Sequence, residues 1–457
     1  MSTAEKAKSA PKLKLKAPLD FQARVMARLN ASAPKTKSDG TRPIAGYEVG
    51  RTSESILSEI KYVLRTGIRS YDDLAGGFPF GRVCEVYGLE SCGKTAMVIR
   101  AAVKAQTKAI CEVVRHLDGR VTYEPLDPKR CDVCVLYIDQ EQSIDDDGKL
   151  RVDGHNADFI LTRVDTVDLL FKEVETVISC AEELELENAA KGIDKIVFVL
   201  IVVDTLAATS CRQELEMEWG KEDYARHPAQ ISSGFRRLIR DINRQNVCMI
   251  CTNQVRDNIK DAGMNAKRRL PSPQSSDYTT FGGKPLRFYA SHRTFMHKVS
   301  GRYKLNPDDR FPAGISISFV TDKNRLRPPM REGRMVLLYG ENGGFSDEFS
   351  MLETLINYHF AEITNKEKQT DIVFKFGSSG VQLTTFGNLG TSLSEDDELP
   401  VARRGRRKDP SIYTRAEWPE FYRSHKADFD KLWDLALQYA FTPSSASPEV
   451  SDSEPNE

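Results

Sequence analysis

Apolar and polar positions follow two different periods along residues 60–340. Strands are predicted at 82–88, 133–139, 195–204, 246–254, 292–299 and 314–320, and the apolar run at 196–203 is typical of a strand buried on both faces of a sheet. Between them, apolar residues recur at helical spacing over 94–106, 166–184 and 231–245. This alternation predicts an α/β fold, in which helices cover a mostly parallel sheet and ligands bind at the carboxyl ends of its strands.

The segments on either side of this core have a different pattern. Residues 1–59 begin with a basic tail, continue with a helical pattern at 19–30 that puts Phe21, Val25 and Leu29 on one face, and end in a linker. We therefore divide the chain into residues 1–59, a core at 60–345, a C-terminal module at 346–442 and a disordered acidic tail at 443–457.

The C-terminal module is predicted to be a small α+β unit. It combines a helical pattern at 349–360, short strands at 371–377 and 381–387, and a final amphipathic helix or helix pair at 418–441. A polar linker before the last helices carries the basic cluster Arg403, Arg404, Arg406, Arg407 and Lys408. This cluster either guides duplex DNA or is simply solvated.

Composition narrows the class of protein. The chain has 457 residues, 40% hydrophobic and 29% charged, with a formal net charge of −1, so any binding to nucleic acid must come from local patches. Nine cysteines in so long a chain do not form a disulfide framework and favour a reducing compartment. The longest apolar run, 196–203, is far shorter than the roughly 20 residues that span a bilayer. We therefore expect neither secretion nor a membrane segment.

A phosphate-binding loop is predicted at GLESCGKT, residues 88–95, between a predicted strand and a predicted helix. It fits the pattern G-x-x-x-x-G-K-S/T, in which Gly88 and Gly93 let backbone amides curl around phosphate oxygens at a helix N-terminus. We expect Lys94 to neutralise the β- and γ-phosphates and Thr95 to ligate Mg²⁺.

Two acidic residues complete the predicted ATPase chemistry. Asp204 ends the apolar run at 195–204, where a carboxylate would hold Mg²⁺ through water, and Glu141 follows Asp139 at the tip of a strand expected to lie beside the P-loop strand. Asp139 and Glu141 are both candidates to orient the attacking water, and the family resemblance described next implies Glu141, whereas Asp145, Asp146 and Asp147 could simply form a solvated acidic loop. The predicted nucleotide-binding residues are Gly88, Leu89, Glu90, Ser91, Cys92, Gly93, Lys94, Thr95 and Asp204.

These segments resemble the RecA family of homologous-recombination ATPases, and its bacterial branch most closely. The resemblance is carried by TGIRSYDDLAGGFPFGRVCEVYGLESCGKT, YIDQEQSID, VVDTLAA, CMICTNQVRDNIKDAG and FGGKPLRFYASHR, which occur in the family's order over roughly residues 60–340. It implies a RecA-like P-loop NTPase core, ATP and Mg²⁺ as cofactors, single- and double-stranded DNA as partners, and self-association into a helical filament. It also implies the cytoplasm of bacteria or of phage-infected cells as the location.

The resemblance assigns roles to residues beyond the P-loop. Gln254 matches a glutamine that senses the γ-phosphate and reorganises the following DNA-binding loop, about 255–281. Lys323 and Arg325 match two basic residues that reach the ATP of the adjacent subunit, although the second is usually a lysine in bacterial members.

The resemblance also assigns contact residues outside the nucleotide site. Phe288 matches an aromatic residue at the subunit interface, with a simple core phenylalanine as the alternative. Positions that match phosphate contacts or lie in the DNA loop are Ser232, Arg236, Arg256, Gly282 and Gly283, which would hold the DNA backbone without reading its sequence.

The chain also departs from the family pattern. Near the position where the family usually stacks an aromatic residue on adenine, this chain has Gly148, so adenine recognition cannot be assigned. The first DNA loop, about 213–227, keeps only its acidic start. An insertion at 107–134 contains Cys111, His116, Cys131 and Cys134, which could form a Cys₃His zinc site.

The leading functional hypothesis is a DNA-dependent ATPase that forms a filament on single-stranded DNA and catalyses homologous pairing and strand exchange. A ring-forming helicase-like motor with the same fold is one alternative. A mediator paralogue that binds DNA and a true recombinase without exchanging strands is the other. The elements FGGKPLRFYASHR and TDKNRLRPP favour the filament, and the complete set Lys94, Thr95, Glu141, Asp204 and Gln254 argues against a mediator without ATPase activity.

Overall fold

The structure, a computed structural model, describes most of the chain from residue 60 to residue 441. The described residues are 60–116, 121–142, 144, 151–152, 155–156, 159–211, 226–244, 246–257, 278–280, 284–305, 309–340, 343–363, 372–374, 418–424 and 426–441. The predicted N-terminal helix, the strand at 381–387, the basic cluster at 403–408 and the acidic tail lie outside these residues, as does Gly148.

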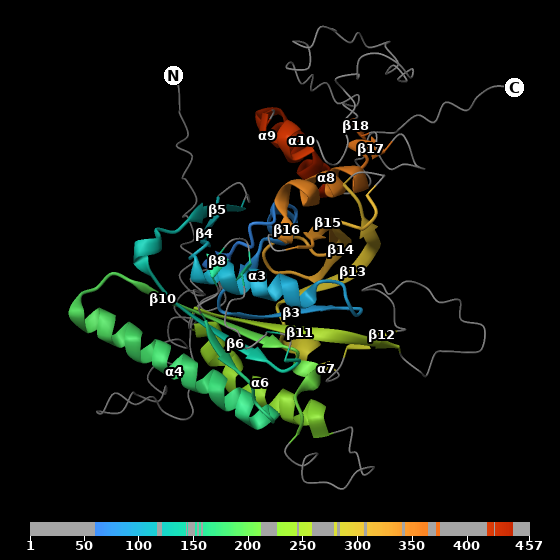
Figure 1. The fold of residues 1–457 in the computed structure, drawn as a ribbon. Helices are drawn as coiled ribbons and strands as arrows, with labels where there is room; N and C mark the ends of the chain where they lie inside the picture. Colours follow the sequence, from blue (N-terminus) through green and yellow to red (C-terminus); the bar gives the residue numbers. More distant parts are fainter. Residues whose placement is uncertain are drawn as a thin grey trace, which may run out of the picture. The chain divides into compact units, whose positions relative to one another are not determined.

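A ten-stranded sheet forms the centre of the described core (Figure 1). Its parallel part has the order β13-β3-β11-β10-β6-β9, and β14, β15 and β16 continue it beyond β13 with antiparallel pairing. The strands are β3 (Arg82–Gly88), β6 (Cys131–Asp139), β9 (Ile160–Thr162), β10 (Ile196–Asp204), β11 (Val247–Asp257), β12 (Tyr278–Thr280), β13 (His292–Tyr303), β14 (Gly314–Lys323), β15 (Arg331–Leu338) and β16 (Gly344–Ser346). The predicted mostly parallel sheet is therefore confirmed.

The order of the strands corrects one expectation. The strand that ends in Asp139 does not lie beside the P-loop strand, because β11 and β10 stand between β3 and β6. A long apolar run shows that a strand is buried but does not specify its neighbours. Asp204 likewise ends a strand, β10, that β11 separates from β3.

Helices cover both faces of the sheet, which explains why its central strands are apolar throughout. The strand positions divide with period two between two hydrophobic clusters: Leu200 and Val202 face one cluster and Ile201 and Val203 the other. Helix α3 (Lys94–Gln106) packs in the first cluster, and α4 (Val167–Lys191) and α6 (Arg226–Arg244) in the second, on opposite sides of the sheet in Figure 1. Short elements connect this core: α2 (Arg69–Ala75), α7 (Lys284–Tyr289), the 3₁₀ turns η2 (Pro128–Arg130) and η3 (Leu206–Ala208), and the pair β7 (Arg151–Val152) and β8 (His155–Asn156).

The insertion at 107–134 adds a hairpin to a second, smaller sheet. Strands β4 (Ile110–Arg115) and β5 (Val121–Pro125) pair with each other, and β4 pairs with β1 (Tyr62–Leu64), which pairs with β2 (Phe78–Pro79). The order is β2-β1-β4-β5, so the hairpin forms one edge of this sheet. The insertion then continues through η2 into β6 of the main sheet.

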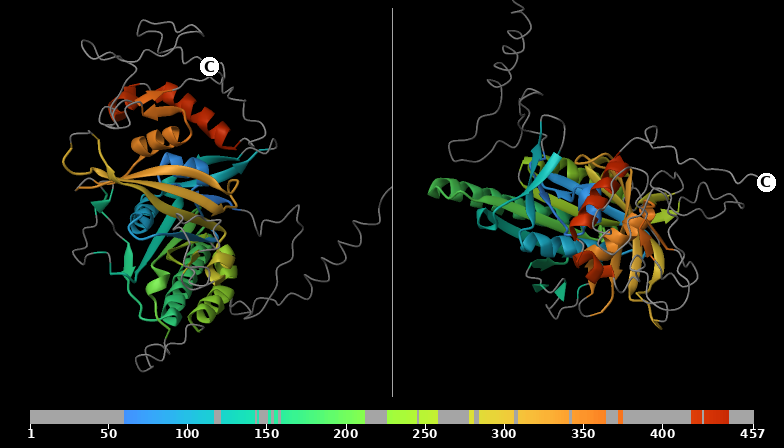
Figure 2. Two further views of the ribbon diagram at one scale, coloured as in Figure 1. Left: turned by 90° about the vertical axis from the view of Figure 1, so that its right-hand side faces the viewer. Right: turned by 90° about the horizontal axis from the view of Figure 1, so that it is seen from above.

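The C-terminal elements pack on the antiparallel side of the core (Figure 2). They comprise α8 (Asp347–Asn357), β17 (Ala361–Ile363), β18 (Ile372–Phe374), α9 (Trp418–Ser424) and α10 (Lys426–Phe441), which confirms a final helix pair. Trp418 and Trp433 are fully buried among the apolar side chains of α8, β13 and β15. Each indole also donates a hydrogen bond, Trp433 Nε1 to Asp73 Oδ2 at 2.9 Å and Trp418 Nε1 to the Glu348 carbonyl at 2.7 Å.

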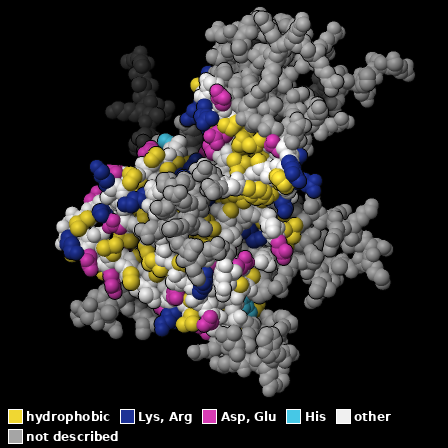
Figure 3. Space-filling model, viewed as in Figure 1, with side chains coloured by type: hydrophobic (Ala, Val, Ile, Leu, Met, Phe, Trp, Pro, Cys, Tyr) yellow, Lys and Arg dark blue, Asp and Glu magenta, His cyan; other side chains and the backbone are white. Residues whose placement is uncertain are grey.

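Surface charge and cysteine state agree with the composition. On the face shown in Figure 3, Lys and Arg side chains lie interspersed with Asp and Glu. All nine cysteines are free thiols. Within the described part of the chain, no helix is both long and apolar enough to cross a membrane.

Asp347 gives a test of how the C-terminal elements join the core. It lies in the first turn of α8 and accepts a hydrogen bond from the Arg69 backbone amide at 2.5 Å. Burial raises the pKa of Asp347 to about 6, against an unfolded value near 4. As pH rises from about 4 to 6 the unfolded carboxyl ionises first, so the folded state loses stability across that interval and the deficit persists at pH 7.

We expect Asp347→Asn, which keeps the acceptor and removes the charge, to raise the thermal midpoint at pH 7 by a few degrees. The gain should vanish below about pH 4, where both states of the parent carboxyl are protonated. Thermal melts followed by circular dichroism across this pH range would measure it. A variant that is less stable at pH 7, or a difference independent of pH, would show that the buried charge is not costly.

Candidate nucleotide site

The loop at 88–95 has the backbone of a phosphate cradle. β3 ends at Gly88 and α3 begins at Lys94, so the helix N-terminus faces the loop. Gly93 has φ +84°, and Ser91 has φ +54°. A Cβ at Gly88 would lie 2.0 Å from the Met296 carbonyl oxygen of the neighbouring β13, so only glycine fits there. The positive φ at Gly93 and the close approach of β13 at Gly88 therefore explain why the motif has glycine at these two positions.

Lys94 folds back over this loop. Its Nζ donates to the carbonyl oxygens of Leu89, at 2.7 Å, and Gly88, at 3.3 Å. Cys92 is buried and its thiol donates to the same Leu89 carbonyl at 2.9 Å. Burial raises the pKa of the Cys92 thiol, so the side chain stays protonated and acts as a donor. The ammonium of Lys94 thus sits at the centre of the loop, where a triphosphate would offer it stronger, charged acceptors.

Asp204 is buried at the carboxyl end of β10 and both of its oxygens accept hydrogen bonds. Tyr137 donates to Oδ2 at 2.8 Å and Thr252 donates to Oδ1 at 2.5 Å. Burial and the negative charge of Asp204 raise the pKa of Tyr137 strongly, so the phenol remains a donor. These two hydroxyls were not predicted from the sequence. The sequence did contain one signal for them, because each is a residue with a hydroxyl group inside an otherwise apolar strand.

Asp204 and Thr95 offer oxygen ligands of the kind that Mg²⁺ prefers. Mg²⁺ usually takes one or two protein oxygens and completes its shell with water and phosphate. A carboxylate fixed by two donors and a hydroxyl in the first turn of α3 fit this pattern. Within the described residues, His, Cys, Asp and Glu side chains form no cluster of three or more that would hold a metal by itself.

Glu141, which follows β6, and Gln254, which lies in β11, are in direct contact although these two strands are not adjacent. Gln254 Nε2 donates to Glu141 Oε1 at 3.2 Å. The turn after β6 crosses the end of β10, with the amides of Gln140 and Glu141 directed at the Asp204 carbonyl at 2.7 and 3.3 Å. Gln254 is opposite Gly88 in the register of β11 and β3. The structure thus brings together the residue expected to activate water, the expected γ-phosphate sensor and the phosphate loop.

The predicted DNA-binding residues lie on α6 and at the end of β11. Arg236 is exposed on α6, one turn after Ser232, whose carbonyl accepts from Arg236 Nε at 3.4 Å. β11 runs beyond Gln254 through Arg256 to Asp257 and pairs with β12, so residues 258–277 connect two paired strands directly after the Gln254 position. Gly282 and Gly283 lie outside the described residues.

Lys323 and Arg325 lie toward the opposite end of the sheet. In the strand register, Lys323 of β14 lies opposite Arg293 of β13, and Arg293 lies opposite Glu85 of β3. Glu85 is three residues before Gly88, which is about 10 Å back along β3. Lys323 Nζ donates to the Phe288 carbonyl at 3.1 Å, on the side away from the P-loop. The two basic residues are therefore not part of the site formed by their own P-loop.

Phe288 is 76% exposed, so the alternative of a core phenylalanine is wrong. Its ring meets Tyr289 edge-on, with centroids 5.4 Å apart. Because Phe288 lies at the surface, the interface role that the resemblance implies stays a prediction.

The zinc hypothesis was wrong, because the structure does not bring its four residues together. Cys111 is buried in an apolar cluster of the small sheet, whereas Cys131 belongs to the core of the main sheet. His116 is exposed and its Nε2 meets the Thr122 hydroxyl at 2.8 Å. Cys134 lies within β6. The short spacing of Cys131 and Cys134 arises because the insertion ends where the strand β6 begins, and there cysteine serves as a small apolar residue.

Comparison with known proteins decides the family. The family model described as the RecA N-terminal domain matches residues 134–344. Protein RecA of Bdellovibrio bacteriovorus is 28% identical over 312 residues, covering 68% of each chain. Protein RecA of Laribacter hongkongensis is 29% identical over 316 residues, 68% of this chain and 73% of that protein. Protein RecA of Xylella fastidiosa is 30% identical over 280 residues, 61% and 65% respectively.

This chain belongs to the RecA family. The matched stretch contains Asp139, Glu141, Asp204, Gln254 and the strands that carry them. The P-loop precedes the matched stretch, and the hairpin of the insertion stands between the two. RecA-family proteins are ATPases that act on DNA, so the P-loop geometry and the family assignment point to the same chemistry.

Tyr137 provides a test of how Asp204 is held. We expect Tyr137→Phe to leave the fold intact and to raise the Mg²⁺ concentration needed for half-maximal ATP hydrolysis by on the order of tenfold, as loss of an outer-shell partner does. The reason is that Asp204 Oδ2 loses its buried hydrogen-bond donor, and the carboxylate then loses its fixed orientation. Mg²⁺ titrations of hydrolysis would measure the change.

Tyr71→Phe is the matched control. Tyr71 is also fully buried, but its hydroxyl contacts His292 and Thr294 on β13 rather than Asp204. Equal Mg²⁺ dependence in both variants would show that the Tyr137 hydroxyl does not orient the metal ligand.

Proposed function

We propose that this protein is an ATP-dependent recombinase that forms a filament on single-stranded DNA and catalyses homologous pairing and strand exchange. The observation that carries the proposal is the hydrogen bond between Gln254 and Glu141 beside the P-loop. Gln254 lies opposite Gly88 of the phosphate loop and four positions before residue 258, where the 258–277 connection begins. A change at the γ-phosphate therefore has a short route to the predicted DNA loop.

ATP hydrolysis would use residues from four strand ends. Lys94 and the N-terminal amides of α3 would bind the β- and γ-phosphates, and Thr95 and Asp204 would hold Mg²⁺, which when bound neutralises charge on the phosphates. Glu141 is exposed and its Oε1 accepts a hydrogen bond from Gln254, so the carboxylate is placed to accept a proton from water. Gln254 would release Glu141 on contacting the γ-phosphate, which ties hydrolysis to the state of β11.

DNA binding would rest on backbone contacts. Ser232, Arg236 and Arg256 would supply hydroxyl and guanidinium donors, and Gly282 and Gly283 backbone amides, to phosphates of the single strand. Such contacts read no base, as a protein that pairs arbitrary homologous sequences requires. Duplex DNA would enter as the second substrate.

Filament formation would complete the active site. We propose that Lys323 and Arg325 of one subunit reach the ATP held by the P-loop of the next, with exposed Phe288 in the contact between them. The distance of Lys323 from its own P-loop and the exposure of Arg325 and Phe288 support this arrangement. An ATP bound between subunits would make the grip on DNA depend on nucleotide, because hydrolysis would loosen the contact that orders the filament.

The two alternatives make different predictions. A helicase-like motor of the same fold would form closed rings on DNA, and a mediator paralogue would bind DNA without exchanging strands. Glu141 and Gln254 in contact favour an active ATPase over a mediator. The bacterial relatives and the free thiols support a cytoplasmic protein of a bacterium or of a phage-infected cell.

Substitutions at two residues separate ATP binding from hydrolysis. We expect Lys94→Ala to abolish ATP hydrolysis and ATP-dependent binding of single-stranded DNA, because the phosphates lose their only lysine in the loop. We expect Glu141→Gln to reduce hydrolysis by roughly 10²- to 10⁴-fold, as loss of a general base does, while ATP still promotes DNA binding.

Phosphate release and fluorescence anisotropy of a labelled oligonucleotide would measure both effects, and thermal melts would confirm folding. Strand exchange by Lys94→Ala without any nucleotide would refute the proposed mechanism. Hexameric rings in negative-stain images would favour the motor instead.

A further inference from the structure

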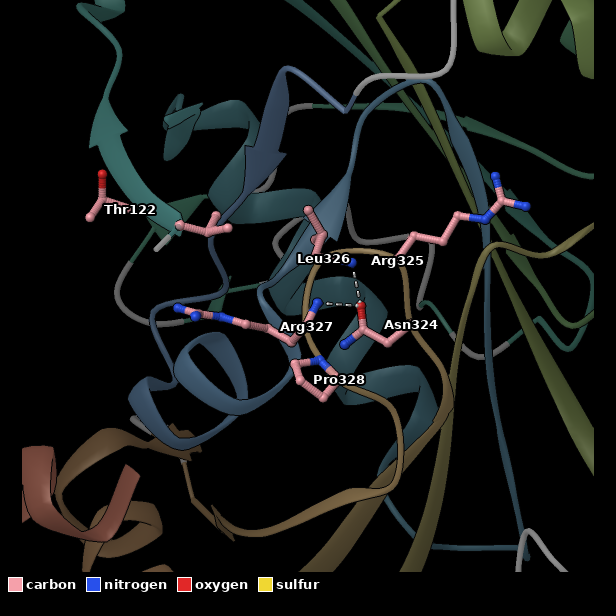
Figure 4. A pocket seen from close by; sticks show the side chains of 7 residues that line it. Thr122, Asn324, Arg325, Leu326, Arg327 and Pro328 are labelled. Carbon is pink, nitrogen blue, oxygen red and sulfur yellow. Dashed lines mark hydrogen bonds between the residues drawn. The ribbon is translucent and has the colours of Figure 1, made fainter. Parts of the chain in front are cut away.

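The loop Asn324–Pro328, which follows β14, forms one wall of an open pocket. The pocket has a volume of about 530 Å³, and its other wall is Val121 and Thr122 of β5, from the insertion (Figure 4). The loop carries Arg325. Thr122 and Asn324 lie 202 positions apart in the sequence, yet both line this pocket.

The loop is fixed at both sides of Arg325. Asn324 donates to the Ala75 carbonyl at 2.8 Å and accepts from the amides of Leu326 and Arg327 at 2.8 and 3.2 Å. Leu326 is 5% exposed and packs in a cluster whose other buried members are Ile60, Val63, Cys111 and Val113. Cys111 and Val113 belong to β4 of the insertion. The hairpin therefore provides much of the apolar socket for Leu326.

Tyr123 of β5 extends this support to Arg327. The Arg327 guanidinium lies 5.2 Å from the centre of the Tyr123 ring, and the Arg65 guanidinium lies 4.9 Å from it. Phe441, near the end of α10, lies 5.6 Å from the same Arg327 guanidinium. A cation near an aromatic face is attracted by the ring, and desolvation strengthens the attraction. Arg327 is thus held by the insertion and by the last helix together.

Arg325 is the side chain that these contacts leave exposed. Figure 4 shows it extending away from Arg327, and no hydrogen bond or ion pair to it occurs in the part of the chain that the structure describes. Two of the charges near it, those of Lys323 and Arg82, have the same sign as its own. Burial lowers the pKa of Lys323 and of Arg82, and repulsion from Arg325 lowers each of them further. Asp322 and Glu85 offset part of the charge of Lys323, and the exposed guanidinium of Arg325 attracts an anion from outside the subunit.

We propose that the β4–β5 hairpin is a brace that holds Arg325 toward a phosphate group bound by a neighbouring copy of this chain, with Tyr123 as the positioning residue. The inference rests on the proposed function, and it adds a role for the insertion. A loop fixed in advance loses less conformational freedom when the anion binds than a free loop would. The brace acts through Arg325 and does not itself touch nucleotide.

The test is a double-substitution cycle between Tyr123→Leu and Arg325→Ala, read as ATP hydrolysis with poly-dT. We expect Tyr123→Leu to lower kcat by about tenfold, the size of one desolvated cation–π interaction, with little change in the binding of a fluorescent ATP analogue to the isolated subunit. Tyr123→Phe, which keeps the ring, should retain the parent rate. In an Arg325→Ala background, Tyr123→Leu should cause no further loss.

Other outcomes would overturn the inference. Losses that multiply in the double variant would show that Tyr123 acts independently of Arg325, and a parental rate in Tyr123→Leu would show that the brace is not needed. If thermal melts show Tyr123→Leu to be unfolded, Arg327→Gln can replace it, because it removes the guanidinium that contacts the Tyr123 ring. It should then lower kcat in the parent background and cause no further loss in the Arg325→Ala background. Absence of DNA-dependent hydrolysis in the parent protein would refute the proposed function itself, whereas normal hydrolysis with additive losses refutes the brace alone.

Discussion

The site depends on the parallel register of four buried strands. β3, β11, β10 and β6 run in the same direction, so their carboxyl ends meet at one edge of the sheet. Register places Gln254 opposite Gly88 and Asp204 opposite Asp139. Because a shift of one residue would turn each of these side chains to the other face of the sheet, the apolar packing on both faces also fixes the chemistry at the edge.

Buried polar contacts connect this edge with the segment that carries Lys323. Asn253, next to Gln254, donates to Glu85 at 3.0 Å, and Arg293 donates to Glu85 and to Asp322, each at 2.5 Å. Glu85 is fully buried and Arg293 is 3% exposed. Removing one member would leave a buried charge without its partner, which is costly, so the strands from β11 to β14 hold a single arrangement. The nucleotide edge and the predicted subunit contact thus belong to one rigid body of sheet.

The sequence was a good guide wherever one local pattern decided the structure. Apolar runs located the central strands, and the glycines of 88–95 located the phosphate loop. Strand order was not predictable in the same way, and β6 proved to lie three positions from β3. The contact of Glu141 with Gln254 depends on a turn that crosses β10, which no local pattern specifies. The cysteines of the insertion were misjudged because ligand spacing was considered without the burial that separates Cys111 from Cys131. Tyr137 and Tyr123 act through partners distant in sequence, so their roles emerged only from the fold.

The central claim is that the nucleotide at this edge sets how firmly the protein holds a single strand of DNA. The most direct measurement is the affinity for a labelled poly-dT oligonucleotide with a slowly hydrolysed ATP analogue, with ADP and with no nucleotide, for the parent and for Gln254→Ala. The account predicts the tightest binding with the analogue, weaker binding in the other two states, and little difference among the three for Gln254→Ala. Equal affinity of the parent protein in all three states would contradict it.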